Sequence, residues 1–155
     1  MESIKQQEKL IEHLIYYFKG NQDAVRFCID ITFIAHVWDD LIDKDNIRTN
    51  EDISNAFKAA LIDIPSNHFY LANINELRPL MLNAIFQWQD ANKLEAGGNY
   101  HDKHMAFMLR ASIVQIFSYC AYLCGGPAWI NEVGPDIRRL YEEDLFEYLK
   151  EFDNA

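Results

Sequence analysis

The stretch AVRFCIDITFIAHVWDDLID, residues 24–43, predicts the fold, because apolar side chains cover most of the circumference of the helix that it would form. A helix that is apolar on nearly all sides needs other helices around it, so we expect it to be the central helix of a bundle. Asn21 or Asp23 can cap its start. Arg26 and Asp30 lie four residues apart and are expected to form an ion pair on its surface.

The rest of the chain is also typical of helices. Five further segments have apolar residues at helical spacing or clear start and stop signals. The first ends at Gly20, and the second is a short helix that begins after Thr49 or Asn50 and ends before Pro65. The third runs from Asn75 to Gly97 and Gly98 with Pro79 near its start, and the fourth is a long helix that is capped by Asn99 and ends at Gly125, Gly126 and Pro127. After a brief turn at 128–133, an acidic last helix covers residues 136–152. The segment at 66–73 is ambiguous. No run alternates with period two as a half-buried strand does, so the sequence predicts an all-α fold, a compact bundle of five or six helices.

Composition and charge restrict the classes of function. The chain has 155 residues, of which 50% are hydrophobic and 14% aromatic, so we expect a single ordered helical domain over residues 1–155. The formal net charge of −10 excludes general attraction to nucleic acid or to an anionic membrane surface. The polar start and the lack of an apolar run of membrane-spanning length predict a cytoplasmic protein without membrane insertion. Three cysteines, Cys28, Cys120 and Cys124, lie in apolar segments and are expected to be reduced core thiols rather than a disulfide or a zinc site.

Three aspartates gather at the C-terminal end of the central helix. At about 100° per residue, Asp40 lies about 100° from Asp39, Asp43 about 40° and His36 about 60°, so the four side chains share one face. Carboxylates at this spacing suit Mg²⁺, which prefers oxygen ligands and bridges to phosphate oxygens. They also repel one another at the negative end of the helix dipole, and a divalent cation would reverse that penalty. The alternative is a solvated acidic helix end with the nearby lysine and arginine as counter-charges.

The segment DDLIDKDNIR, residues 39–48, resembles the first aspartate-rich motif, DDxxD, of the isoprenoid synthases, that is, of trans-prenyltransferases and terpene cyclases. Arg48 lies five residues after Asp43, where the form DDxxDxxxxR of the prenyltransferases has its arginine. The resemblance implies an isoprenoid-synthase-like bundle, or a reduced version of it, in which Asp39, Asp40 and Asp43 hold Mg²⁺ against a prenyl diphosphate and Arg48 contacts the phosphates. The metal would neutralise the leaving group, which is the chemistry of a prenyl-diphosphate transferase or lyase.

The second acidic motif of that family has its nearest counterpart in FQWQDANKLE, residues 86–95, where FQWQD resembles the start of FQxxDD and an alanine stands in place of the second aspartate. Asn83, Gln87 and Asp90 have the spacing i, i+4, i+7 and form a polar stripe on an otherwise apolar helix. These three residues and His36 are the further candidates for binding a substrate. The alternative is a buried hydrogen-bonding stripe that fixes the register of the helix.

Two other constellations are candidates for metal chemistry. One is an HD pair of the kind found in all-α metal phosphohydrolases, with the candidate ligands His101, Asp102 and His104, His36 or His68, and Asp136 or Asp144. The other is a DDxxE-like set late in the chain, made of Glu143, Asp144 and Glu147. Helix capping and a solvated helix face are the structural explanations for the same residues.

Two main classes of function follow from the sequence. One is Mg²⁺-dependent binding, with or without turnover, of a prenyl or other diphosphate. The other is a non-catalytic helical module that oligomerises or binds a protein. Three tryptophans, eight tyrosines and ten phenylalanines are more than a small bundle easily hides, so we expect an exposed interface and a homo-oligomer.

Overall fold

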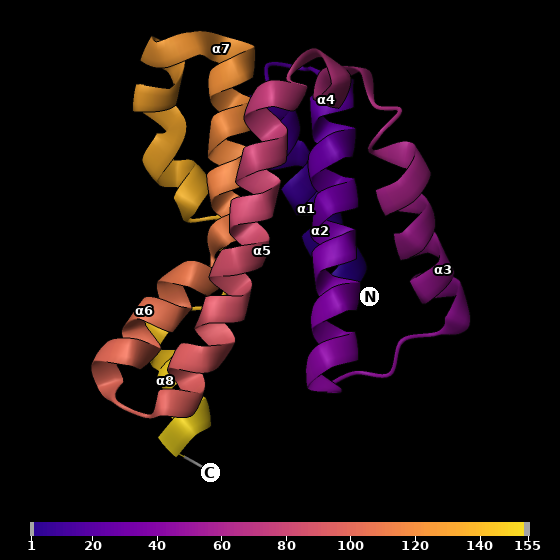
Figure 1. The fold of residues 1–155 in the computed structure, drawn as a ribbon. Coiled ribbons are helices and arrows are strands. Elements are labelled where there is room, and N and C mark those ends of the chain that lie inside the picture. The colour runs from indigo at the N-terminus through magenta and orange to yellow at the C-terminus, as the bar shows by residue number, and fades with distance from the viewer. Residues whose placement is uncertain (1, 154–155) are drawn as a thin grey trace. The chain divides into compact units, whose positions relative to one another are not determined.

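Helices make up nearly all of the computed structural model, which describes residues 2–153, with side chains from residue 4 onward. No strand occurs within these residues, so the all-α prediction is confirmed. The chain divides into two compact units, Met1–Ile74 and Asn75–Ala155, coloured indigo to magenta and pink to yellow in Figure 1. The organisation as a single domain stays a prediction.

The predicted central helix is the centre of the first unit. Every other helical element of this unit packs against it (Figure 1). The elements are α1 (Glu2–Tyr17), the central α2 (Gln22–Asp43), α3 (Asn50–Lys58), the π-helical turn η1 (Ala59–Asp63) and α4 (His68–Ala72). The side chain of Asn21 accepts the backbone N–H of Ala24 at 3.0 Å, which confirms Asn21 as the cap of α2. Arg26 and Asp30 form the predicted ion pair at 3.6 Å.

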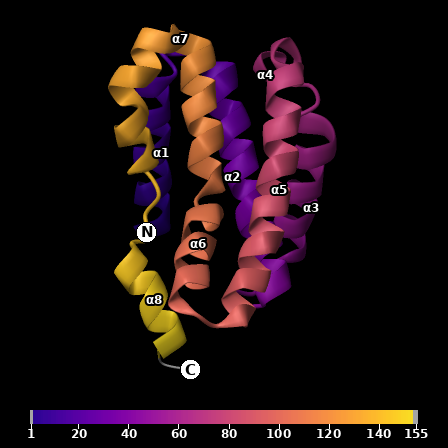
Figure 2. The ribbon, with the colours of Figure 1, turned by 60° about the vertical axis from the view of Figure 1, so that its left-hand side comes forward.

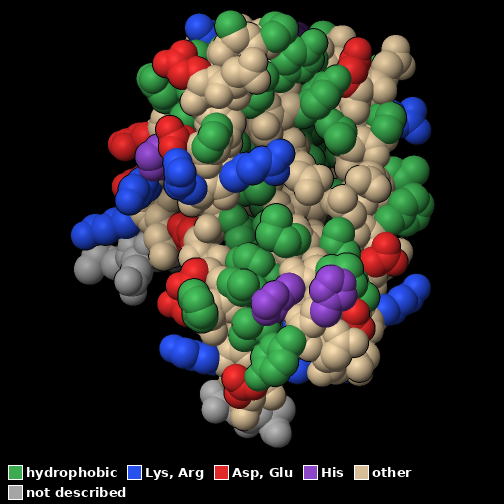
Figure 3. Space-filling view, turned by 90° about the vertical axis from the view of Figure 1, so that its left-hand side faces the viewer, with side chains coloured by type: hydrophobic (Ala, Val, Ile, Leu, Met, Phe, Trp, Pro, Cys, Tyr) green, Lys and Arg blue, Asp and Glu red, His purple; other side chains and the backbone are tan. Residues whose placement is uncertain are grey.

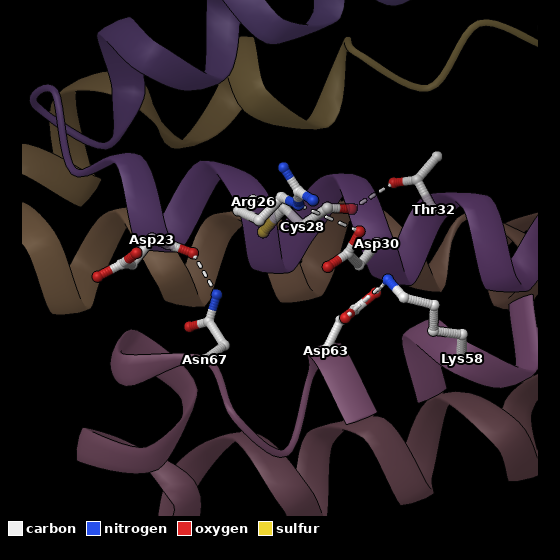
Figure 4. Close-up of polar contacts among 8 residues, drawn as sticks. All are labelled: Asp23, Arg26, Cys28, Asp30, Thr32, Lys58, Asp63 and Asn67. Atoms are coloured by element: carbon white, nitrogen blue, oxygen red, sulfur yellow. Dashed lines mark hydrogen bonds and ion pairs between the residues drawn. The ribbon is translucent and has the colours of Figure 1, made fainter. Parts of the chain in front are cut away.

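The ambiguous segment at 66–73 forms the short helix α4, which is held to the start of α2. Asn67 accepts the N–H of Tyr70 at 2.9 Å and donates to the backbone carbonyl of Asp23 at 2.9 Å (Figure 4). The ring of Tyr70 stacks on the ring of Phe27 of α2, with 5.7 Å between the ring centroids, and Phe69 also packs against Phe27. One asparagine therefore caps α4 and fixes it against the central helix.

Four helices occur among the described residues of the second unit (Figure 2). They are α5 (Ile74–Gly97), α6 (Tyr100–Arg110), α7 (Ser112–Arg138) and α8 (Leu145–Asp153). The first has its predicted bounds to within one residue, whereas the boundaries of the others differ from the predicted ones. Asn99 caps α6 as predicted, accepting the N–H of Asp102 at 2.8 Å. The long helix expected after Asn99 is divided at Ala111, and the last helix begins at Leu145, so its predicted start at residue 136 is wrong.

The glycine pair in α7 makes a kink rather than the end of a helix. Gly126 has a φ of 84° and a ψ of −177°, a conformation that favours glycine, and the chain turns back there (Figure 2). Pro127 then begins a new helical segment, where its missing N–H costs nothing. A Cβ on Gly125 would lie 2.1 Å from Cδ1 of Trp129, so the indole fills the space that the glycine leaves. Residues 128–133 are therefore helical, and the predicted turn there is wrong.

The stretch Tyr100–Arg138 is the one among the described residues that is long and apolar enough, by length and composition, to cross a membrane. It is divided at Ala111 and kinked at Gly126. The helix between these two points is about 21 Å long at 1.5 Å per residue, shorter than the ~30 Å of bilayer hydrocarbon. The absence of membrane insertion and the cytoplasmic location stay predictions.

Candidate functional site

Asp40 is the buried member of the predicted aspartate cluster, with 8% of its surface exposed. Its Oδ2 accepts a hydrogen bond from Nε of Arg48 at 2.6 Å, and its Oδ1 accepts one from Nδ2 of Asn46 at 3.0 Å. The backbone carbonyl of Asp40 accepts the N–H of Lys44 at 2.9 Å. Side chain and main chain together therefore hold the loop that follows α2. We call Asp40, Asn46 and Arg48 the aspartate clamp.

The clamp joins the end of α2 to the start of α3. Lys44 closes α2 in the left-handed conformation, with a φ of 61°, and turns the chain away from the helix axis. Thr49 caps α3 by accepting the N–H of Asp52 at 3.0 Å, as predicted. The guanidinium of Arg48 lies 3.9 Å from the Asp52 carboxylate as well as against Asp40. Arg48 therefore bridges one acidic residue on each helix.

The same contacts set the charge state of Asp40. The hydrogen bond from Asn46 and the ion pair with Arg48 hold the pKa of the Asp40 carboxyl below its usual value, although burial acts in the opposite direction. The guanidinium also compensates the negative end of the α2 dipole. The unfavourable placement of an aspartate at a helix C-terminus is thus offset by a cation from the chain itself.

The donor set does not fit a three-carboxylate Mg²⁺ site in this arrangement. Both oxygens of Asp40 already accept hydrogen bonds, so a metal would have to displace Asn46 and Arg48. Across residues 4–153, no three His, Cys, Asp or Glu side chains are grouped closely enough to hold a metal ion. Asp39 is half-buried and Asp43 is exposed, and each interacts with a neighbouring group. Magnesium binding by these residues stays a prediction.

The other proposed substrate residues are divided between the two units. His36 is exposed on α2 and interacts with a neighbouring group. Asn83, Gln87 and Asp90 lie on α5 in the second unit, with Asn83 and Asp90 exposed. Oε1 of Gln87 is enclosed and has no hydrogen-bond partner among the described residues. The stripe therefore contains one polar atom whose burial is uncompensated.

Capping accounts for two of the alternative metal ligands, Asp102 and Asp144. Asn99 and Asp102 cap α6 reciprocally, because the carboxylate of Asp102 also accepts from Nδ2 of Asn99 at 3.1 Å. Asp144 caps α8 by accepting the N–H of Glu147 at 2.8 Å. The remaining candidates are exposed or paired: His68, His101 and His104 are exposed, Asp136 pairs with Arg139, and Glu143 accepts a hydrogen bond from Tyr141.

The sequence analysis missed a polar cluster in the second unit. Arg110 at the end of α6 donates to both oxygens of Glu95 at 2.5 and 2.6 Å and to Oδ1 of Asn92 at 2.6 Å. The hydroxyl of Tyr148 in α8 donates to Glu95 at 2.5 Å. Burial opposes the ionisation of Glu95, but these donors outweigh it and lower its pKa, whereas burial and the Glu95 charge raise the pKa of Tyr148. The cluster joins α5, α6 and α8.

An apolar core beside this cluster completes the junction of the same three helices. Ala91, Ala106 and Tyr148 are buried together, and further apolar side chains of α5, α6 and α8 pack around them. Ala91 of α5 and Ala106 of α6 are small, and they share this buried cluster with the ring of Tyr148 of α8. The sequence signal was weak, because Glu95 and Arg110 lie 15 residues apart on different helices. The arrangement is structural, since each polar group of Glu95 has a protein partner.

A groove lies between α2 and α3 in the first unit. It has a volume of about 210 Å³ and is lined on the α2 side by Ile34, Val37, Trp38 and Leu41, and on the α3 and η1 side by Ile53, Ala56, Phe57 and Ala60. Val37 and Ala56 are buried, whereas Leu41 and Phe57 are 46% and 62% exposed. The groove thus has an apolar floor and an apolar, solvent-exposed rim.

The two ends of the groove differ in their polar groups. The aspartate clamp and the loop from α2 to α3 lie beyond Leu41 and Ile53. In the opposite direction, Asp30 of α2 faces Asp63 of η1, which Lys58 holds at 2.9 Å (Figure 4). Burial raises the pKa of Asp30, and the Asp63 charge acts in the same direction. Carboxylates therefore flank the groove at both ends, with a lysine ion pair at the second end.

Exposed hydrophobic side chains also occur in the second unit. Figure 3 shows a face of the molecule on which such side chains gather among acidic, basic and histidine side chains. In α5 and α6 the exposed large apolar residues are Leu82, Ile85, Phe86, Tyr100, Met105 and Met108. Unlike the residues of the first unit, they do not line a described groove.

Comparison of the chain with protein-family models, with curated proteins and with solved structures finds no match.

Proposed function

We propose that the first unit is a helical protein-interaction module, whose groove between α2 and α3 receives an amphipathic helix of a partner protein. The observation that supports this proposal is the groove itself, in which every lining side chain is apolar and both walls are helices. Amphipathic helices bind in such grooves through anchors spaced at i, i+3, i+4 and i+7. The exposed rim residues Leu41 and Phe57 would be covered by such a helix.

The size of the groove favours side-chain anchors over an enclosed small molecule. Its volume of about 210 Å³ is below the ~300–1,000 Å³ of typical small-molecule sites. Fully burying a Leu or Phe side chain contributes about 1.5–3 kcal/mol, and about half of Leu41 and Phe57 remains to be buried. Covering both would contribute on the order of 2 kcal/mol, roughly thirty-fold in affinity.

Mg²⁺-dependent binding of a diphosphate by Asp39, Asp40 and Asp43 is the rival proposal. It is supported by the resemblance of the motif and by the position of Arg48 next to Asp40. This proposal requires that Arg48 leave Asp40 to contact the phosphates, and that the metal take the place of Arg48 beside the Asp40 carboxylate. Because this exchange breaks two hydrogen bonds to a buried carboxylate, we rank it below the interaction module.

A titration followed by amide NMR spectra tests the interaction proposal. The probe is an uncharged helix-forming peptide of about 18 residues, or ~27 Å, with leucines at i, i+3, i+4 and i+7. We expect the shifted signals to gather on the residues that line the groove. Phe57→Glu should weaken binding at least about thirty-fold, because it removes an anchor contact and would bury a charge.

The matched control is Phe146→Glu in α8, which makes the same substitution at a side chain that is 77% exposed and lies outside the groove. It should leave the affinity for the peptide unchanged. Circular dichroism should show the same helix content for both variants, since each position is exposed. Shifts scattered away from the groove, or equal binding by Phe57→Glu and wild type, would reject the interaction module.

A further inference from the structure

We infer that the groove selects a partner helix that carries lysines or arginines next to its apolar anchors, and this inference rests on the proposed function. The first observation is the charge of the segment that joins the two walls. Residues 39–52 contain six carboxylates and two cations, a formal net charge of −4. Because the segment connects α2 to α3, its charge is located at one end of the groove rather than spread along it.

The pairing of Arg48 adds to the difference in charge between the two ends of the groove. This cation is engaged by Asp40 at 2.6 Å and by Asp52 at 3.9 Å, so it is held at the junction of the two helices. Asp45 and Glu51 lie on the exposed part of the segment. At the other end of the groove, Lys58 and Arg26 pair with Asp63 and Asp30, which leaves less net negative charge there.

Charge complementarity therefore identifies the class of occupant. A helix with basic residues near one end of its apolar face would place them beside the acidic segment while its anchors enter the groove. Such complementarity accelerates association and penalises like-charged partners. A second copy of this chain is a poorer occupant, because each copy has a formal net charge of −10.

Two peptides with the same apolar face separate the contribution of charge to the binding affinity from the contribution of the apolar anchors. Both are helix-forming peptides of about 18 residues, and one has lysines where the other has glutamates in its last turn. At about 20 mM salt we expect the lysine peptide to bind at least about ten-fold more tightly than the glutamate peptide, by fluorescence anisotropy. At about 500 mM salt the difference should nearly vanish, because the screening length falls to a few ångströms.

A charge-reversed variant and its control test whether residues 39–52 cause the preference for the lysine peptide. Asp45→Lys with Glu51→Lys raises the formal charge of the segment by four, from −4 to zero, and should abolish the preference for lysine. Glu8→Lys with Glu12→Lys changes the net charge of the chain equally on exposed positions of α1, which lines no part of the groove. This control should retain the preference, and its loss there would overturn the inference in favour of a general charge effect.

The remaining outcomes distinguish the two proposals. Equal binding of both peptides at low salt, with both lost in Phe57→Glu, would overturn the basic partner and leave the interaction module intact. Failure of both peptides to bind, together with a monomer mass by light scattering, would reject the module itself. A dimer mass that returns to about that of the 18.2 kDa monomer in Phe57→Glu would identify a second copy as the occupant and also overturn the inference.

Discussion

Replacing Arg48 by methionine should lower the free energy of unfolding of the first unit by about 2 kcal/mol at neutral pH. Methionine retains the apolar part of the side chain, so the change removes mainly the hydrogen bond and ion pair with Asp40. A hydrogen bond to a charged group contributes about 1.5–3 kcal/mol. The side chains of Arg48 and Asp40 are 25% and 10% exposed, so the pair lies between a surface ion pair at about 0–1 kcal/mol and a buried one at about 3–5 kcal/mol.

The dependence on pH provides the stricter test. The folded state lowers the pKa of Asp40, so the ion pair contributes stability above the pKa of an unfolded aspartate, and this contribution is lost as the pH falls through the lowered folded pKa. The difference between Arg48→Met and wild type should therefore be full at pH 7 and shrink steadily below about pH 3.9. Urea unfolding followed by the fluorescence of Trp38 measures it for the first unit when both variants also carry Trp88→Phe and Trp129→Phe.

Arg26→Met is the matched control, in which an arginine loses its ion pair with another aspartate of α2. Arg26 also pairs with an aspartate, at 3.6 Å, but its side chain is 71% exposed, so its loss should cost at most about 0.5 kcal/mol. If Arg48→Met cost no more than this control, the aspartate clamp would contribute nothing measurable. A loss that persisted unchanged in acid would show that packing, rather than the charge of Asp40, explains the role of Arg48.

Four further outcomes can be measured on the same protein. Thermal unfolding of the wild type should show no stabilisation by Mg²⁺ with inorganic diphosphate, and the double variant Asp40→Ala with Asp43→Ala should be less stable than the wild type. If Mg²⁺ with diphosphate stabilised the wild type but not the double variant, the diphosphate site would be supported instead. Gln87→Leu should raise the free energy of unfolding by about 1 kcal/mol in urea titrations, since it removes an enclosed oxygen without a described partner, and a loss of stability would mean that this oxygen is satisfied. Tyr148→Phe should lower it by about 1–2 kcal/mol because a carboxylate loses a donor, and an unchanged midpoint would contradict that contact. Burial raises the pKa of Cys124 to about 11, so iodoacetamide should modify it on the order of 10²-fold more slowly than a free cysteine at pH 8, as mass spectrometry would show; equal rates would place the thiol in solvent.

The starts of α2, α3 and α6 could be predicted from the sequence because their causes are local. Asn21, Thr49 and Asn99 each cap the helix that follows, through a hydrogen bond to a backbone N–H three residues ahead. Such a bond depends on the side chain and on the next turn alone. The neighbours of these residues in the fold have little influence on it, so the sequence contains the whole signal.

The course of α7 could not be predicted, because it depends on packing between residues on both sides of a kink. Gly125, Gly126 and Pro127 have the composition of a helix end, and the sequence predicted one there. In the structure the positive φ of Gly126 turns the chain, and Trp129 fills the space beside Gly125. Only the position of that indole shows that the helix resumes at once, and a local pattern contains no information about it.

The candidate site was predictable in its residues but not in its contacts. The spacing placed Asp40 on one face with Asp39 and Asp43, and the alternative interpretation named Arg48 as a counter-charge of this acidic end, without singling out Asp40. Asn46 was missed because a neutral side chain in a charged loop has no distinctive pattern. The groove was also missed, since it depends on how far apart the α2 and α3 walls pack.

At the acidic end of α2, the burial of Asp40 is compensated by groups of the chain itself. An aspartate at the negative end of a helix is unfavourable by up to about 1 kcal/mol when it is exposed, and more so when it is buried without a partner. Arg48 and Asn46 offset this penalty for Asp40 and in doing so hold the loop that joins α2 to α3. The exposed Asp45 and Glu51 take no part in the contacts of the aspartate clamp, so we expect their charges to act on a partner. Substitutions in the clamp should therefore change stability, whereas substitutions at these two positions should change the choice of partner.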